Sequence, residues 1–123
     1  MSTNVRDGRG PAESEARPRE KRVRRRLSVG ITVPGQGLIA GWTSNLALHG
    51  LSLGANRVFP PGTALKAVIQ LPDSERATVE GVVTWSRKGI VGGMSAMGIK
   101  FSGESPQYLA FLKRFHPEVF RKG

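Results

Sequence analysis

The sequence predicts a mainly β domain: six short strands in an antiparallel barrel or sandwich, with one C-terminal helix covering its open end. Two observations lead to this prediction. Apolar residues alternate with polar or small residues in several short runs, and glycine or proline separates the runs. Near the C-terminus, the spacing of the apolar residues changes to the helical period. With 123 residues, the chain is long enough for one such domain with its own hydrophobic core.

The first 20 residues predict a disordered tail. Val5 is their only large aliphatic residue, and most of the others are charged, small or turn-forming. Such a composition cannot bury enough apolar surface to offset the entropy lost on ordering. We therefore place a disordered basic tail at residues 1–20, the folded domain at residues 21–118 and a short tail at residues 119–123.

Alternation predicts the first three strands. The first covers residues 27–33, in which every second residue is Leu, Val or Ile and faces the same side of a sheet. PGQG at residues 34–37 predicts a turn. Two further strands are predicted over residues 41–47 and 51–55, on either side of a corner at residues 48–50.

Proline and glycine divide the second half of the chain. PPG at residues 60–62 ends the segment before it, because proline lacks the N–H that a strand ladder needs. PDSE at residues 72–75 predicts a tight hairpin turn. The remaining three strands are predicted over residues 65–71, 77–85 and 97–101.

The segment after the last strand predicts the helix. Ser105 is the expected N-cap and Pro106 the first helical residue, where the missing N–H of proline costs nothing. His116 and Pro117 end the helix. Its apolar stripe, at positions i, i+3, i+4 and i+7, consists of Tyr108, Phe111, Leu112 and Phe115.

The charge distribution predicts an anionic partner. The formal net charge is +10, from 19 Lys and Arg against 9 Asp and Glu. Residues 1–26 hold nine of the cations and four of the acids, so about a fifth of the length carries half of the excess. Within this region, five of six consecutive residues are cationic: Lys21, Arg22, Arg24, Arg25 and Arg26. Charge alone does not choose between a nucleotide, a nucleic acid, an anionic headgroup and an acidic protein.

Signals for catalysis, metal binding and membrane insertion are absent from the sequence. The chain has no cysteine, and His49 and His116 lack the spacing of a metal site or an acid/base pair. No phosphate-binding loop or nucleophile elbow occurs. No apolar run approaches the ~18 residues of a spanning helix, and the N-terminus has no apolar signal region. We expect a cytoplasmic, non-enzymatic binding protein without metal, cofactor or membrane insertion.

Two short segments are candidates for the binding site. Arg22 and Arg26 offer planar guanidinium groups that match phosphate oxygens and the guanine edge, and that stack on purines. On a flexible segment beside a rigid barrel, they are expected to wrap a small nucleotide and to become ordered with it. Asn45 offers both a donor and an acceptor, Ala47 is small, and Gly50 permits close backbone approach. On composition alone, a solvated tail and an ordinary β-corner are the favoured explanations of these residues.

Together, the two segments resemble the PilZ family of bacterial cyclic di-GMP receptors. The family signature is an RxxxR pair before the first strand, followed by [D/N]xSxxG. RVRRR at residues 22–26 matches the first part, and NLALHG at residues 45–50 matches the second with alanine in place of serine. VVTWSR at residues 82–87 and MGIKF at residues 97–101 also fit, and the resemblance covers residues 21–115.

This resemblance implies a fold, a function and a site. The fold is a six-stranded antiparallel PilZ-type β-barrel with a C-terminal helix. The function is that of a receptor or adaptor that binds cyclic di-GMP and relays the signal to a protein partner. Arg22 and Arg26 would clamp the guanines and phosphates, and Asn45 would hydrogen-bond a guanine or ribose. Gly50 would give close approach, and Ala47 would stand where the family has serine.

Three further expectations follow from the same resemblance. Arg24 and Arg25 are additional candidates for ligand contact, including a second base when the ligand binds as a stacked dimer. The serine hydroxyl that Ala47 lacks would form a hydrogen bond worth about 0.5–1.5 kcal/mol. Its loss is expected to weaken affinity several-fold without abolishing it.

Two other functions stay open. One is a PilZ-like protein-interaction module that no longer binds nucleotide, which Ala47 suggests. The other is a basic β-barrel that binds nucleic acid, for which exposed aromatic residues on the strands would be evidence. Trp42 and Trp85 are the candidates, but Trp85 is in phase with the inward-facing residues of its strand and is expected in the core. The low aromatic content, 7%, argues against nucleic acid as the partner.

Overall fold

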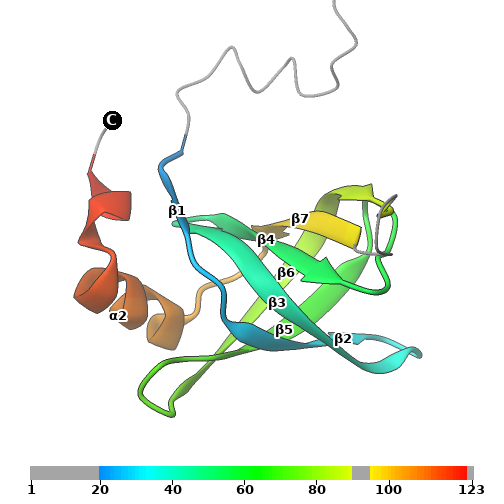
Figure 1. Cartoon of the computed structure of the whole chain (residues 1–123), viewed down its shortest axis with the longest axis horizontal. Helices are drawn as coiled ribbons and strands as arrows, with labels where there is room; N and C mark the ends of the chain where they lie inside the picture. Colours follow the sequence, from blue (N-terminus) through cyan, green and yellow to red (C-terminus); the bar gives the residue numbers. More distant parts are fainter. Residues whose placement is uncertain (1–19, 90–94, 122–123) are drawn as a thin grey trace, which may run out of the picture.

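A computed structural model describes residues 20–89 and 95–121, which form a closed antiparallel β-barrel with one additional short strand (Figure 1). Hydrogen-bonded neighbours follow the order β1-β3-β2-β5-β6-β7-β4, and β4 also pairs with β3, which closes the barrel. The six barrel strands confirm the predicted fold class. The strands are β1 (Arg22–Arg24), β2 (Ser28–Val33), β3 (Gly37–Ala47), β4 (Gly50–Ala55), β5 (Ala64–Gln70), β6 (Arg76–Arg87) and β7 (Ser95–Phe101).

The alternation that predicted the strands corresponds to the observed burial. In β2, Val29, Ile31 and Val33 are buried, whereas Ser28 and Thr32 are exposed. Side chains that face inward from all six barrel strands form one hydrophobic core. The predicted turns connect β2 to β3 and β5 to β6, although β3 begins at Gly37 rather than at residue 41. Nearly all of the predicted disordered tail, residues 1–19, lies outside the described residues.

The arginine-rich segment differs from its prediction. Its sequence predicts no strand, yet Arg22–Arg24 pair antiparallel with the end of β3 as β1. Val23 packs against the core and Leu27 is buried, so the run contains apolar anchors between its cations. The expectation of a flexible arm is therefore wrong for residues 20–27, which lie along the barrel.

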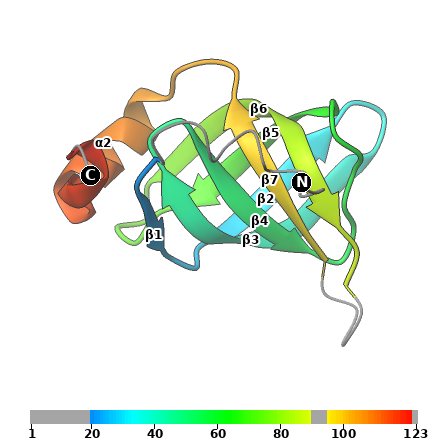
Figure 2. The same ribbon diagram turned by 90° about the horizontal axis from the view of Figure 1, so that it is seen from above.

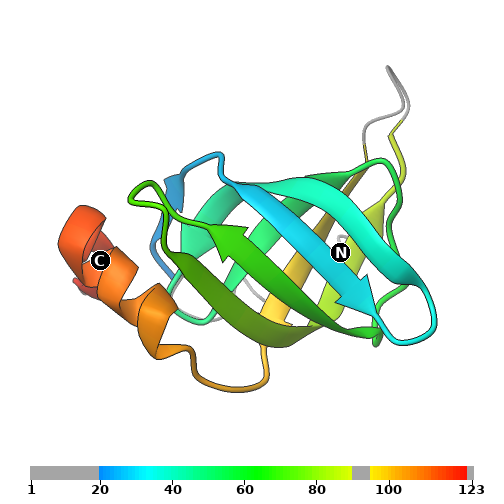
Figure 3. The ribbon, with the colours of Figure 1, turned by 90° about the horizontal axis from the view of Figure 1, so that it is seen from below.

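The C-terminal helix α2 (Pro106–Phe115) lies at one end of the barrel beside β1 (Figures 1, 2 and 3). The Ser105 side chain accepts a hydrogen bond from the Tyr108 N–H, 3.3 Å away, so the predicted N-cap is confirmed. Tyr108, Phe111 and Leu112 are buried against the barrel. Three of the four residues of the predicted apolar stripe therefore form the face that packs, whereas the fourth, Phe115, is 38% exposed.

A short 3₁₀-helix, η1 (Pro117–Phe120), continues from α2. Val119 is buried within it, 4% exposed, and belongs to the core cluster. The predicted end of the domain at residue 118 falls inside this helix, because a single buried residue beyond Pro117 forms no pattern in the sequence.

Two β-bulges change which side chains reach the outer surface. One lies between Thr43 and Asn45 in β3, and the other between Val83 and Trp85 in β6. A bulge adds one residue to one strand and so reverses the inward and outward alternation beyond it. Trp85 therefore faces outward and is 39% exposed, so its predicted place in the core is wrong.

Candidate ligand-binding site

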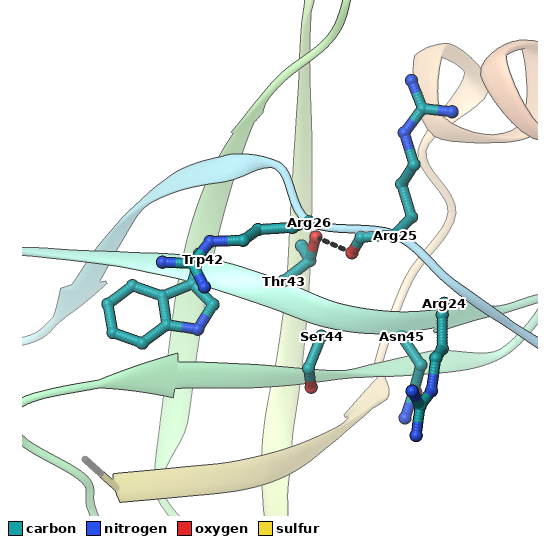
Figure 4. A pocket seen from close by; sticks show the side chains of 7 residues that line it. All are labelled: Arg24, Arg25, Arg26, Trp42, Thr43, Ser44 and Asn45. Atoms are coloured by element: carbon teal, nitrogen blue, oxygen red, sulfur yellow. Dashed lines mark hydrogen bonds between the residues drawn. The ribbon is translucent and has the colours of Figure 1, made fainter. Parts of the chain in front are cut away.

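A pocket of about 470 Å³ opens on the outer face of the barrel, where the arginine-rich segment meets β3 (Figure 4). Two short runs of sequence line it, one on each side. Three of its seven lining residues are arginines and none is acidic, so the pocket carries a positive potential that suits an anion. The lining residues are Arg24, Arg25, Arg26, Trp42, Thr43, Ser44 and Asn45.

Thr43 fixes the backbone on both sides of Arg26. Its hydroxyl donates to the Arg25 carbonyl oxygen, 2.7 Å away, and accepts from the Leu27 N–H at 2.8 Å. The Thr43 N–H also donates to the Leu27 carbonyl at 2.8 Å. Thr43 is fully buried, so the hydrogen bond from the Leu27 N–H is shielded from water and the one to the Arg25 carbonyl partly so. The sequence did not mark Thr43, because only the register of the two strands places it here.

Arg26 and Trp42 form a stack at one end of the pocket. The Arg26 guanidinium lies 4.7 Å from the centroid of the indole ring (Figure 4), within the range of a cation–π interaction. Trp42 is opposite Gly54 on β4, and a Cβ at residue 54 would lie 2.5 Å from the indole Nε1. The ring therefore rests directly on the β4 backbone, with the arginine on its other side.

Asn45 stands at the other end of the pocket with two arginines. The register of β1 on β3 places Arg24 opposite Asn45, and their side chains lie beside each other in Figure 4. Arg22 does not line the pocket, but its Nη1 donates to Asn45 Oδ1 at 2.8 Å. The structure thus brings the two predicted motifs together, with Arg22 and Arg24 at Asn45 and Arg26 at Trp42.

Arg25 points away from Asn45, toward the C-terminal helix (Figure 4). Its guanidinium lies 5.6 Å from the centroid of Phe111, and its Nη1 is 3.1 Å from His116 Nε2. Because a guanidinium only donates, His116 accepts through Nε2. Arg25 therefore links the arginine-rich segment to the junction of α2 and η1.

Ala47 and Gly50 lie beneath the surface and do not line the pocket. The carbonyl of Ala47 accepts a hydrogen bond from the Tyr108 hydroxyl at 2.7 Å. Burial raises the pKa of Tyr108 far above its usual value, so the hydroxyl stays protonated and donates. A Cβ at Gly50 would overlap the carbonyl oxygen of Ile99, so glycine is needed for β4 to approach β7. The ligand contacts predicted for these two residues stay predictions.

The Glu20 carboxylate, at the start of the arginine-rich segment, binds the corner between β3 and β4. Glu20 Oε2 accepts from the His49 backbone N–H at 2.7 Å and lies 2.6 Å from His49 Nδ1. His49 is the fifth residue of the NLALHG motif. The arginine-rich segment is therefore hydrogen-bonded to β3 at Thr43 and, through Glu20, to this motif as well. No pattern in the sequence predicts this pair.

Beyond the pocket, a row of paired residues crosses the outer face from β3 to β6. Asn45 pairs with Ser52, Ser52 with Gly98, and Gly98 with Trp85. Strands are spaced at about 4.8 Å, so the row spans about 14 Å. Ser52 and Gly98 have small or no side chains, so the surface between Asn45 and the outward-facing Trp85 is shallow. The sequence missed this arrangement because it depends on strand order and on the bulge in β6.

The described parts of the chain contain neither a cluster of three or more potential metal-ligating side chains nor a helix long and apolar enough to cross a membrane.

Closed antiparallel barrels occur in small domains of several functions, so the family is decided by the sequence. A sequence profile of the PilZ domain matches residues 16–116. The chain therefore belongs to the PilZ family, whose domains are generally cyclic di-GMP receptors or adaptors rather than enzymes.

Comparison with solved structures finds a protein of similar fold. The chain is similar to the Bacillus subtilis inhibitor of motility, MotI/DgrA, with a TM-score of 0.65 and 20% sequence identity. The similar region covers 81% of this chain and 51% of that protein, so the chain spans about half the length of its structural relative. No curated protein sequence matches the chain.

Proposed function

We propose that the protein is a cyclic di-GMP receptor that binds the dinucleotide in the pocket between β3 and the arginine-rich segment. The observation that supports this most directly is the convergence of Arg24 and Arg26 with Asn45 in one pocket whose lining contains no acidic residue, with Arg22 hydrogen-bonded to Asn45 beside it. Guanidinium groups pair with phosphates and with the O6/N7 edge of guanine, and asparagine hydrogen-bonds a base or ribose. One pocket thus offers partners for both chemical parts of the ligand.

Hydrogen bonding within the pocket prepares its groups and also competes with the ligand. Arg22 already donates to Asn45, so the ligand must replace or share this bond. Replacing one hydrogen bond by another has a small net cost, whereas the arginines are already held near their working positions. The pocket is thus largely formed before binding, and the ligand rearranges side chains rather than the whole segment.

The relay to a protein partner is proposed to run through α2 and η1. Arg25 contacts Phe111 and His116, and Tyr108 bonds the carbonyl of Ala47, so both motif segments touch this C-terminal unit. Arg25 lies between the pocket residues Arg24 and Arg26 in sequence, so a small backbone shift at either residue on binding would reach Arg25 and its contacts on the C-terminal unit. We expect amide hydrogen exchange in η1 to change on saturation with cyclic di-GMP, and the change to be lost in Arg25→Ala. Unchanged exchange in the wild-type protein would contradict this relay.

Calorimetric titration with cyclic di-GMP at physiological salt tests the proposed function. GMP and a short single-stranded oligonucleotide serve as controls. Saturable binding of cyclic di-GMP alone supports the receptor, and the stoichiometry separates one ligand from a stacked pair. Absence of binding would instead favour an adaptor that works through protein contacts, as Ala47 suggests. Oligonucleotide binding that weakens steeply with salt would favour nucleic acid as the partner.

A further inference from the structure

We infer that Trp42 is a positioning residue for the ligand: it holds the Arg26 guanidinium flat on its indole ring, so that the opposite face of the guanidinium receives a purine base. The inference rests on the proposed function and adds to it a residue that lies outside both sequence motifs. It starts from the stack of Gly54, Trp42 and Arg26, in which each member restricts the next.

The indole ring is fixed from below. Trp42 is paired with Gly54 across β3 and β4, and the ring occupies the space that any side chain at residue 54 would need. The ring is half-buried and lines one end of the pocket. A large ring in contact with backbone on one face has few alternative rotamers. Trp42 is therefore a firm platform.

Arg26 is held at both of its ends. Thr43 binds the backbone groups of Arg25 and Leu27 on either side, so the Cα of Arg26 has a fixed position. The guanidinium then rests on the indole, 4.7 Å from its centroid, although the residue as a whole is exposed. An arginine in such an exposed place otherwise samples many rotamers, which a ligand would have to restrict on binding.

The kind of contact matters for what Arg26 can still do. A stacked guanidinium uses its face, so the interaction with Trp42 occupies none of its five N–H donors. Arg22 is held differently, because one of its N–H groups donates a hydrogen bond to Asn45. Arg26 thus keeps its whole edge for phosphate or guanine oxygens, and its open face is a flat cation on which a purine stacks.

A double-mutant cycle between Trp42 and Arg26 tests the inference. We expect Trp42→Leu to weaken cyclic di-GMP binding about three- to tenfold, since Arg26 must then be ordered by the ligand. In the Arg26→Ala background, the same change is expected to alter affinity less than about twofold, since the group that Trp42 positions is gone. Trp42→Phe keeps a platform and should stay within about threefold of the wild-type protein.

Nuclear magnetic resonance provides a second test that needs no ligand. Protons above an aromatic ring are shifted upfield, so the Arg26 side-chain protons should be shifted in the wild-type protein and in Trp42→Phe, but not in Trp42→Leu. If Trp42→Leu fails to fold, as judged by the absence of a cooperative unfolding transition, the comparison of wild-type protein with Trp42→Phe still shows whether the Arg26 protons lie above the ring.

The outcomes separate this inference from the proposed function. Wild-type binding with equal losses from Trp42→Leu in both backgrounds, or with unshifted Arg26 protons, overturns the positioning role and leaves the receptor intact. No cyclic di-GMP binding by the wild-type protein overturns the receptor and this inference with it. Non-additive losses together with shifted Arg26 protons support both.

Discussion

The outer face of the barrel carries two stacks of the same kind with different surroundings. Trp42 rests on Gly54 of the neighbouring strand, and Trp85 rests in the same way on Gly98. Each ring also has an arginine nearby: Arg26 at 4.7 Å from the Trp42 ring, and Arg87 at 5.7 Å from the Trp85 ring.

The two stacks share more than their aromatic rings. Each lies at a β-bulge and has a threonine as its neighbour in sequence, Thr43 beside Trp42 and Thr84 beside Trp85. Thr43 is buried and ties a second segment to the strand, whereas Thr84 donates only to the Gly98 carbonyl across its own strand pair, at 3.2 Å. Only the Trp42 stack therefore has a second segment tied beside it, which places Arg24 and Asn45 in the same pocket as its arginine.

The largest expected difference is in ligand affinity. Arg26→Ala should weaken cyclic di-GMP binding at least tenfold, because hydrogen bonds to charged groups are each worth about 1.5–3 kcal/mol. Arg87→Ala, the equivalent change in the other stack, should cost less, and calorimetry on both variants measures the contrast. Arg22→Ala should resemble Arg26→Ala, and loss of both should bring binding below detection.

Arg57 provides the control for loss of charge alone. It hydrogen-bonds Gln36 in the turn between β2 and β3, at the other end of β3 from the pocket. Arg57→Ala should change affinity less than about twofold, since exposed charges this far away are largely screened. A loss equal to that of Arg26→Ala would mean that net charge, rather than the pocket, determines binding.

The second difference is in stability. Thr43→Val leaves the Leu27 N–H and Arg25 carbonyl without their buried partner, which should lower the free energy of unfolding by about 1–3 kcal/mol. Thr84→Val removes a single, longer hydrogen bond at an exposed residue and should cost about 0.5 kcal/mol or less. Urea denaturation of the two variants measures this, and equal losses would remove the distinction between the stacks.

The link from the pocket to α2 should have a smaller effect. Tyr108→Phe removes the hydrogen bond to the Ala47 carbonyl but keeps the ring, so we expect a loss of about 1 kcal/mol in the free energy of unfolding. Urea denaturation again provides the value. No loss would show that water or another group satisfies the carbonyl, and that Tyr108 does not hold the motif in place.

The smallest expected effect is a gain. Ala47→Ser restores the family's hydroxyl and should tighten cyclic di-GMP binding about two- to tenfold, the worth of one neutral hydrogen bond. Calorimetry on this variant measures it. Unchanged affinity would show that the hydroxyl stays buried beneath the pocket, where Ala47 lies, and does not reach the ligand.

The fold was largely predictable because its signals are local. Alternation marked the six barrel strands, Ser105 and Pro106 marked the start of the helix, and PDSE marked a hairpin turn. The strand β1 was not predictable in the same way. Its anchor, Val23, is a single apolar residue among arginines, and only the exposed end of β3 gives it a partner.

The candidate site was predictable only in part. The motif spacing indicated that Arg22 and Arg26 share a site with Asn45. In the structure Arg22 hydrogen-bonds Asn45, whereas Arg26 lies at the other end of the pocket, on Trp42. The roles of Trp42 and Thr43 depend on which residues face each other across strands, and alternation does not provide this register. Trp85 was placed on the wrong side because one bulge reverses the alternation, and no residue near it signals the bulge.

The most direct test of the proposed site uses the fact that the chain has only two tryptophans. In Trp85→Phe, all tryptophan emission comes from Trp42 at the pocket. We predict a saturable change in this emission on titration with cyclic di-GMP, with the same midpoint as the calorimetric binding and no change with GMP. Calorimetric binding that leaves the Trp42 emission unchanged, or the absence of any binding, would contradict the account.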